Sequence, residues 1–208
     1  VTPRAALVFA VCIEAFAFVW LWVLVNPLSA WLALAACLFY VFVYTLWLKR
    51  TSTQNIVIGG AAGAAPVLIG WSAVTDTVSL SAVVLFGVVF FWTPPHFWAL
   101  AIRYSDDYSA VDVPMLPSVS SLQNTTTQML AHTAAMVACS LLFGYTESMG
   151  PIYWIGAVAA GVAFLGLTWR VRRSGSASDA MKLFHFSITY LTLLFVVMAL
   201  DVIVRFGI

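Results

Sequence analysis

The stretch WTPPHFWALAIRYSDDYSAVDVPMLP, residues 92–117, is where a mostly apolar chain gathers a histidine, an arginine and three carboxylates. If residues 96–107 form one helix, Arg103 follows His96 by seven positions and Asp107 follows it by eleven, so the three side chains share one face. The imidazole then lies roughly 10 Å deeper than Arg103 and about 16 Å deeper than Asp107. We therefore expect a polar stripe suited to a long ligand with a polar headgroup and an apolar body.

The composition of the chain is that of a polytopic membrane protein. It is 63% hydrophobic and only 8% charged, far from the roughly 25% charged residues of soluble domains. A net charge of +1 without a basic tail argues against nucleic acid as a partner. The three cysteines lie in apolar segments with no CxxC spacing, so we expect packing roles rather than disulfides or metal clusters.

We expect an all-α fold, a transmembrane helical bundle with seven helices in a single domain over residues 1–208. Apolar runs between helix-breaking residues give the bounds, and each run is long enough to cross a bilayer. The expected spans are 4–25, 28–48, 55–74, 78–102, 124–145, 151–171 and 183–205.

Basic residues predict the orientation of the bundle. With a cytoplasmic N-terminus, every Lys and Arg except Arg205 falls on the inner side, as the positive-inside rule prefers. The inner loop after Arg103 runs for about twenty residues and carries Asp106, Asp107 and Asp112. Long loops in compact proteins are often functional, so we expect the active-site loops on the cytoplasmic side.

Two segments before this stretch each permit a structural and a functional interpretation. Lys49 and Arg50 end the second span, where cations commonly anchor a helix, but the polar run TSTQN that follows favours an anion site. The third span, residues 55–74, is rich in glycine from Gly59 to Gly70. Close helix packing is the favoured interpretation, and a smooth wall for a flat or chain-like ligand is the alternative.

Buried ionisable residues and prolines mark further positions. Glu14 lies near mid-membrane, either facing a cavity or as a protonated structural carboxyl. Pro94 and Pro95 remove backbone donors before His96, so we expect a kink there that leaves carbonyls unpaired. All three histidines map to the cytoplasmic halves of their helices, and an inward-opening pocket would collect them. We expect hydrogen-bonded packing roles for His132 and His185 and a ligand-facing role for His96.

Charged residues in the last two spans predict two local features. Asp201 and Arg205, four positions apart, predict a local ion pair without a chemical role. Arg170, Arg172, Arg173 and the Ser/Gly linker through Ser178 predict a flexible inner loop that serves as an orientation signal.

Carboxylates beside cations at one membrane face suit a diphosphate held through Mg²⁺, which binds one or two carboxylates plus phosphate oxygens. Lys49, Arg50 and Arg103 would neutralise the departing diphosphate. Adjacent Asp106 and Asp107 point about 100° apart on a regular helix, so one of them is the expected metal ligand unless the helix frays.

Longer blocks of sequence resemble the protohaem IX farnesyltransferases (haem O synthases), which are UbiA-type intramembrane prenyltransferases. The resemblance covers most of the chain. It rests on YTLWLKR (44–50), QNIVIGGAAGAAPVLIGW (54–71), WTPPHFWALAIRYSDDY (92–108), VPMLP (113–117) and FHFSITYLTLLF (184–195).

The resemblance implies a nine-helix family member whose first two helices and first Asn/Asp-rich motif lie upstream of Val1. We therefore expect a chain truncated at its N-terminus, with half of the metal and diphosphate site missing. Asp112 stands where the family pattern has glycine, so its part in metal binding is an open point.

The implied reaction adds the farnesyl group of farnesyl diphosphate, with water, to a vinyl group of haem b and yields haem O and diphosphate. Mg²⁺ is the implied cofactor, and the implied location is the bacterial cell membrane, with haem A synthase and terminal oxidase assembly factors as partner proteins. A quinone-pathway aromatic prenyltransferase is the alternative enzyme, although it has no use for the PPHFWAL histidine. A transporter is a more distant alternative, because it would show repeated halves.

The implied site combines a polar end with an apolar wall. The glycine-rich wall with Trp92 and Phe97 would line the apolar ligands. The full set expected at the site is Lys49, Arg50, Arg103, Asp106 and Asp107 for diphosphate and catalysis, with Asp106 and Asp107 also as metal ligands, and His96, Asn55, Trp92 and Tyr108 as contacts of the bound groups. His96 is expected to orient the haem or to ligate its iron.

Overall fold

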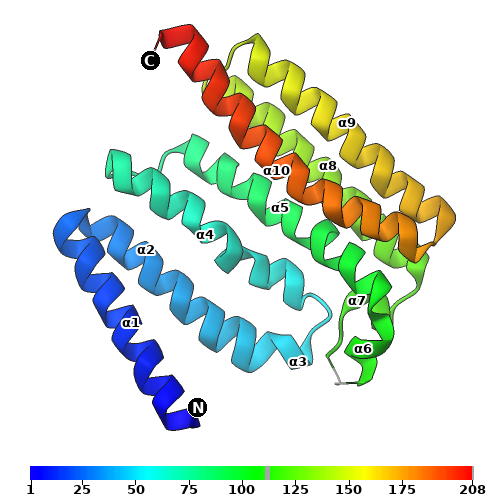
Figure 1. Cartoon of the computed structure of the whole chain (residues 1–208), viewed down its shortest axis with the longest axis horizontal. Helices are drawn as coiled ribbons and strands as arrows, with labels where there is room; N and C mark the ends of the chain where they lie inside the picture. The colour runs from blue at the N-terminus through cyan, green and yellow to red at the C-terminus, as the bar shows by residue number, and fades with distance from the viewer. Residues whose placement is uncertain (111–112, 208) are drawn as a thin grey trace.

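The computed structural model describes residues 1–110 and 113–207 and shows a bundle of long helices (Figure 1). Seven helices within the described residues are long and apolar enough to cross a membrane, which confirms the expected fold class and all seven spans. That residues 1–208 form a single domain stays a prediction. The elements are α1 (Pro3–Leu24), α2 (Pro27–Leu38), the π-helix η1 (Phe39–Leu48), α3 (Lys49–Thr51), α4 (Asn55–Thr75), α5 (Leu80–Arg103), α6 (Ser105–Ala110), α7 (Leu116–Val119), α8 (Leu122–Thr146), α9 (Pro151–Ser174) and α10 (Ala177–Phe206).

The helix ends follow local sequence signals. Asn26 precedes Pro27, and its side-chain oxygen accepts a hydrogen bond from the Ser29 backbone at 2.8 Å. Such caps satisfy backbone N–H groups that have no partner inside the helix. Gly175 follows the last residue of α9, and its φ of 61° is the left-handed conformation that glycine adopts without strain. These signals explain why the spans are predictable from sequence within a few residues.

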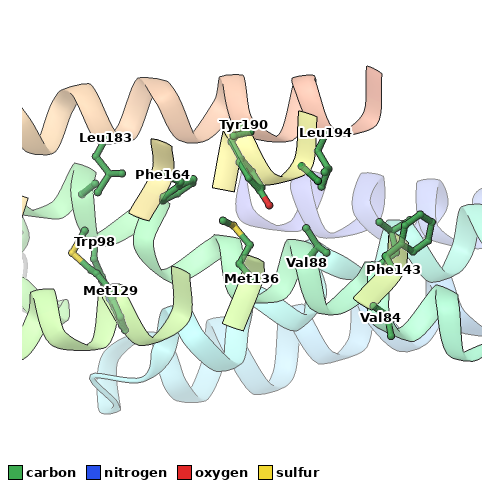
Figure 2. Packing of buried hydrophobic residues seen from close by; sticks show 14 of the residues in the cluster. Val84, Val88, Trp98, Met129, Met136, Phe143, Phe164, Leu183, Tyr190 and Leu194 are labelled. Carbon is green, nitrogen blue, oxygen red and sulfur yellow. The ribbon is translucent and has the colours of Figure 1, made fainter. Parts of the chain in front are cut away.

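The core lies among α5, α8, α9 and α10. Leu183, Tyr190 and Leu194 extend from α10 toward the other helices of this group (Figure 2). The hydroxyl of buried Tyr190 lies 2.6 Å from the Ser140 hydroxyl, and Tyr153 donates to the Ser140 carbonyl at 2.8 Å. Because these internal polar groups are paired, the core contains hydrogen bonds that fix the register of three helices at little desolvation cost.

The link between α9 and α10 is shorter and more tightly held than expected. Helix α9 continues through Arg173 to Ser174, and α10 begins at Ala177, six residues before the predicted bound. Asp179 forms ion pairs at 3.1 Å with Arg170 and with Lys182. The prediction of a flexible loop was therefore wrong, because a capping serine and this carboxylate order the linker.

The predicted ion pair between Asp201 and Arg205 is confirmed at 3.6 Å. Asp201 is fully buried, and it also accepts hydrogen bonds from the backbone N–H groups of Gly150 at 2.6 Å and Tyr153 at 3.3 Å. The carboxylate therefore caps the start of α9 from α10, a role that the spacing of four residues does not show.

The helices gather most of the basic side chains at one end of the bundle. The N-terminus, α3, α6 and the turn between α9 and α10 all lie at this end in Figure 1, and we call it the basic end. Arg205 lies in the last turn of α10, at the opposite end. This arrangement agrees with the expected distribution of charge along the bundle, while the cytoplasmic side remains a prediction.

Candidate active site

The continuous polar stripe expected over residues 96–107 is wrong. Helix α5 ends at Arg103, Tyr104 leaves the helical conformation with φ −113° and ψ 28°, and α6 starts a separate helix at Ser105. Asp107 therefore does not continue the face of His96 and Arg103. Serine followed by two aspartates is typical of a helix start, because acidic groups stabilise the N-terminal turn. That signal was present in the sequence.

A cavity of about 600 Å³ lies between α2, η1, α4 and α5. Its walls are the glycine-rich face of α4, two tyrosines of η1 and the side chains of α5 that face α4. The glycine wall, Trp92 and Phe97 line one cavity, as the expected wall for apolar ligands requires, and their contact with ligands stays a prediction. The residues that line the cavity include Cys37, Tyr40, Tyr44, Ile56, Gly59, Gly60, Gly63, Val89, Trp92, Thr93 and Phe97.

The glycines of α4 fit both interpretations of this span, which are close helix packing and a smooth wall for a ligand. A β-carbon at Gly59 would lie 2.4 Å from the Tyr44 ring, and one at Gly60 would lie 3.1 Å from Thr93. At Gly63 a β-carbon would meet no atom within 4 Å. Gly59 and Gly60 therefore permit close approach of neighbouring groups, whereas Gly63 leaves open space beside the cavity.

The second span reaches the basic end as a π-helix. Lys49 and Arg50 follow η1 directly, and both side chains are exposed. Tyr40 and Tyr44 of η1 line the cavity, with ring centroids 5.3 Å apart. Sequence reasoning did not assign these tyrosines to the site, although Tyr44 opens the block YTLWLKR. π-helical segments occur frequently at functional sites, and here one joins the cavity wall to two cations.

Asn55 and Tyr108 lie in the small contact network that joins α3, α4 and α6. Asn55 is 1% exposed, and its amide donates to the Lys49 carbonyl at 3.3 Å. Its side-chain oxygen has no hydrogen-bond partner among the described residues. Tyr108 packs on a cluster that contains Ile56, the neighbour of Asn55. Tyr108 of α6 and Ile56 at the start of α4 thus belong to one small cluster, together with Ala101 and Met115.

Asp106 and Asp107 lie exposed in the first turn of α6, and Arg103 is exposed at the end of α5. No group of three or more metal-ligating side chains occurs within the described residues. Asp112 lies outside the described residues. Two exposed carboxylates fit Mg²⁺, because this ion binds oxygen ligands and commonly takes one or two carboxylates together with phosphate oxygens and water.

His96 is a packed residue in this structure. It is 9% exposed, and its Nδ1 lies 2.6 Å from the Ser187 hydroxyl. Its ring stacks on Trp92 at 4.2 Å and on Phe184 at 4.6 Å. Trp92 lines the cavity and donates its indole N–H to the Ser187 carbonyl at 2.8 Å. His96 therefore supports a wall of the cavity from behind, and its contact with a haem stays a prediction.

The other two histidines form local hydrogen bonds, and the cavity does not collect the three as expected. His132 Nδ1 lies 2.8 Å from the Gln128 carbonyl, and His185 Nδ1 lies 2.7 Å from the Met181 carbonyl. None of the three histidines lines the cavity. Helix α5 is continuous through Pro94 and Pro95, and the expected kink with unpaired carbonyls stays a prediction. Glu14 is half-buried in α1, and the choice between its two interpretations stays a prediction.

Comparisons with known proteins agree with this architecture. The model of the UbiA prenyltransferase family matches residues 1–196. The chain is 56% identical to the protoheme IX farnesyltransferase of Frankia casuarinae, over 98% of this chain and 72% of that protein. It is 50% identical to the protoheme IX farnesyltransferase of Paenarthrobacter aurescens, over 97% of this chain and 64% of that protein.

A solved structure described as digeranylgeranylglyceryl phosphate synthase in membranes has the same fold, with a TM-score of 0.83. It is 15% identical and aligns with 98% of this chain and 71% of that chain. The chain belongs to the UbiA family of prenyltransferases and, within it, to the protoheme IX farnesyltransferases.

Proposed function

We propose that this protein transfers the farnesyl group of farnesyl diphosphate to a vinyl group of haem b and so forms haem O. The bond between the first farnesyl carbon and the diphosphate oxygen breaks, and diphosphate leaves with the electron pair. The vinyl carbon forms the new bond to farnesyl, water adds to the neighbouring carbon, and a proton is released. Similarity to proteins named protoheme IX farnesyltransferase, over 97–98% of this chain, carries the proposal.

The shape and chemistry of the site support a diphosphate at the basic end and an apolar chain inside the bundle. The residues that line the cavity carry no formal charge, and the cavity starts near Tyr44 and Ile56. Lys49 and Arg50 lie between these two residues in the chain, in α3. We assign Lys49, Arg50 and Arg103 to the diphosphate, because guanidinium and ammonium groups stabilise the negative charge that develops as it leaves.

Asp106 and Asp107 would hold Mg²⁺ against the diphosphate. When bound, the ion would stabilise charge on the leaving group. The unpaired oxygen of buried Asn55 supports a place for Asn55 and Tyr108 at the polar end, since a buried acceptor normally has a partner. Trp92, backed by His96, would face the apolar groups. We place this polar end on the cytoplasmic side of a bacterial plasma membrane, with haem A synthase and terminal oxidase assembly factors as partners.

Extraction of haems from cells that express the full-length protein tests this proposal. The expected result is haem O that depends on the protein, identified by its added mass and its elution. Prenylated quinone precursors without haem O would assign the protein to aromatic prenyl transfer instead. An inactive variant of the same protein is the matched control, because it separates product formation from expression.

A further inference from the structure

The cavity changes character along its length. Near the basic end its walls are the aromatic side chains of Tyr44 and Phe97, whereas its other end is lined by Cys37, Gly63 and Val89. Ile56 and Gly63 are seven residues apart on α4, so the cavity extends about 10 Å along this helix. On α5 the eight residues between Phe97 and Val89 correspond to about 12 Å.

A chain whose diphosphate lies at the basic end must place its last carbons at the far end of this cavity. Gly63 is the residue of α4 farthest from the basic end that lines the cavity. The same face of α4 is reached again at Gly70, seven residues later, but Gly70 borders a separate cavity with Trp71 and Phe143. Between them Val67 packs on the hydrophobic core, so the first cavity does not continue along this face.

Gly63 differs from the other glycines of the wall in the space that a side chain would meet. At Gly59 and Gly60 an added β-carbon would contact Tyr44 or Thr93, so the neighbouring groups themselves exclude a larger residue. At Gly63 no atom lies within 4 Å. A side chain there would therefore project into free space at the end of the cavity that Gly63 lines rather than disturb helix packing, and glycine is not required by the backbone of α4.

We propose that Gly63 determines the length of the isoprenoid that the enzyme accepts, by leaving room at the far end of the cavity for the last isoprene unit. This inference rests on the proposed function. A larger residue at position 63 shortens the space available to the chain without touching the groups assigned to the diphosphate. The cost of excluding even one methylene from an apolar site is about tenfold or more in specificity, so loss of a whole unit is measurable.

The test is a competition in which the full-length protein in membranes receives haem b and equal amounts of geranyl, farnesyl and geranylgeranyl diphosphates. The prenylated haems are quantified by mass spectrometry. For Gly63→Leu we expect the ratio of farnesyl to geranyl product to fall at least tenfold relative to the wild type. Gly63→Ala should give a smaller fall in the same direction and covers the case in which the larger variant does not accumulate.

Gly70→Leu is the matched control, because an added side chain there also meets no atom within 4 Å but lies outside the cavity. Its product ratio should stay within twofold of the wild type. The proposal is overturned if both Gly63 variants keep the wild-type ratio. It is also overturned if they raise KM for haem b and leave the ratio unchanged, because the far end would then hold haem. A wild-type protein that uses none of the three diphosphates would instead reject the proposed function itself.

Discussion

Helix α5 has two sides that differ in how their neighbours pack. Toward α8 and α10 it presents Val88 and Trp98, both fully buried in the core (Figure 2). Toward α4 it presents Thr93 and Phe97, which line a cavity of about 600 Å³. The difference comes from the partner helices: α8, α9 and α10 bring large side chains such as Phe164, whereas α4 brings glycine.

The two sides of α5 let one bundle combine stability with room for a ligand. On the packed side, interdigitated side chains hold the helices in one register. On the open side, the small residues of α4 leave a volume that no side chain of the described residues fills. A ligand in that volume would be positioned by a rigid wall, since α5 is held from behind by the core.

The largest effect is expected where the open side meets the basic end. Replacing Asp106 and Asp107 together by Asn should lower haem O formation by roughly 1,000-fold, because the developing charge of the diphosphate loses its metal. Both carboxylates are exposed, so we expect normal thermal unfolding of the variant. Activity is measured as haem O per amount of folded protein. Glu147→Gln, an exposed acid in the turn before α9, is the control, and a double variant that kept a tenth of the activity would contradict the assignment.

On the packed side, we expect substitution of Asp201 to cause the largest loss of thermal stability. Asp201→Ala removes two backbone hydrogen bonds and the pair with Arg205, and we expect the melting temperature in detergent to fall by roughly 5–10 °C. Arg205→Ala should have a smaller effect, because the carboxylate keeps both N–H donors. An equal fall for the two variants would mean that the ion pair, rather than the cap, carries the stabilisation.

Loss of the cations next to η1 should affect one substrate only. Lys49→Ala and Arg50→Ala should each weaken binding of farnesyl diphosphate by roughly 10- to 100-fold, the usual value of a charge-assisted contact. Haem binding should change little, and titration of each ligand separately measures the difference. If the affinity for farnesyl diphosphate were unchanged, Lys49 and Arg50 would only anchor the helix at the membrane surface.

The smallest effect is expected behind the cavity wall. His96→Ala removes the ring that stacks on Trp92, so we expect haem affinity to fall about tenfold with a shifted Soret band. Binding of farnesyl diphosphate with Mg²⁺ should survive. His132→Ala and His185→Ala are matched controls with milder expected effects, because Nδ1 of each lies within hydrogen-bond distance of a carbonyl of its own helix and neither side chain lines the cavity. If either control removed the haem spectrum and His96→Ala did not, the haem contact would move to that histidine.

The spans and their ends were predictable because they depend on local properties. Apolar runs of about 20 residues, prolines after Asn26 and Gly150, and glycine at position 175 act within one or two turns of the chain. The fold class and the family followed from the same local blocks. The glycine density of residues 54–71 is visible in the sequence, but it left close packing and a smooth wall as alternatives, and only the neighbouring helices separate Gly59 and Gly60 from Gly63.

By itself, then, the sequence determined that seven apolar helices cross a membrane and that one end collects the charges. Only the tertiary structure decided that Gly63 faces open space while Gly60 contacts Thr93, that Ser187 and Phe184 enclose His96, and that Asp201 caps α9. These facts depend on which residues distant in the chain approach a given helix face. The helical period predicts which residues share one face of a helix. It does not predict which helix packs against that face, because this depends on the packing of the whole bundle.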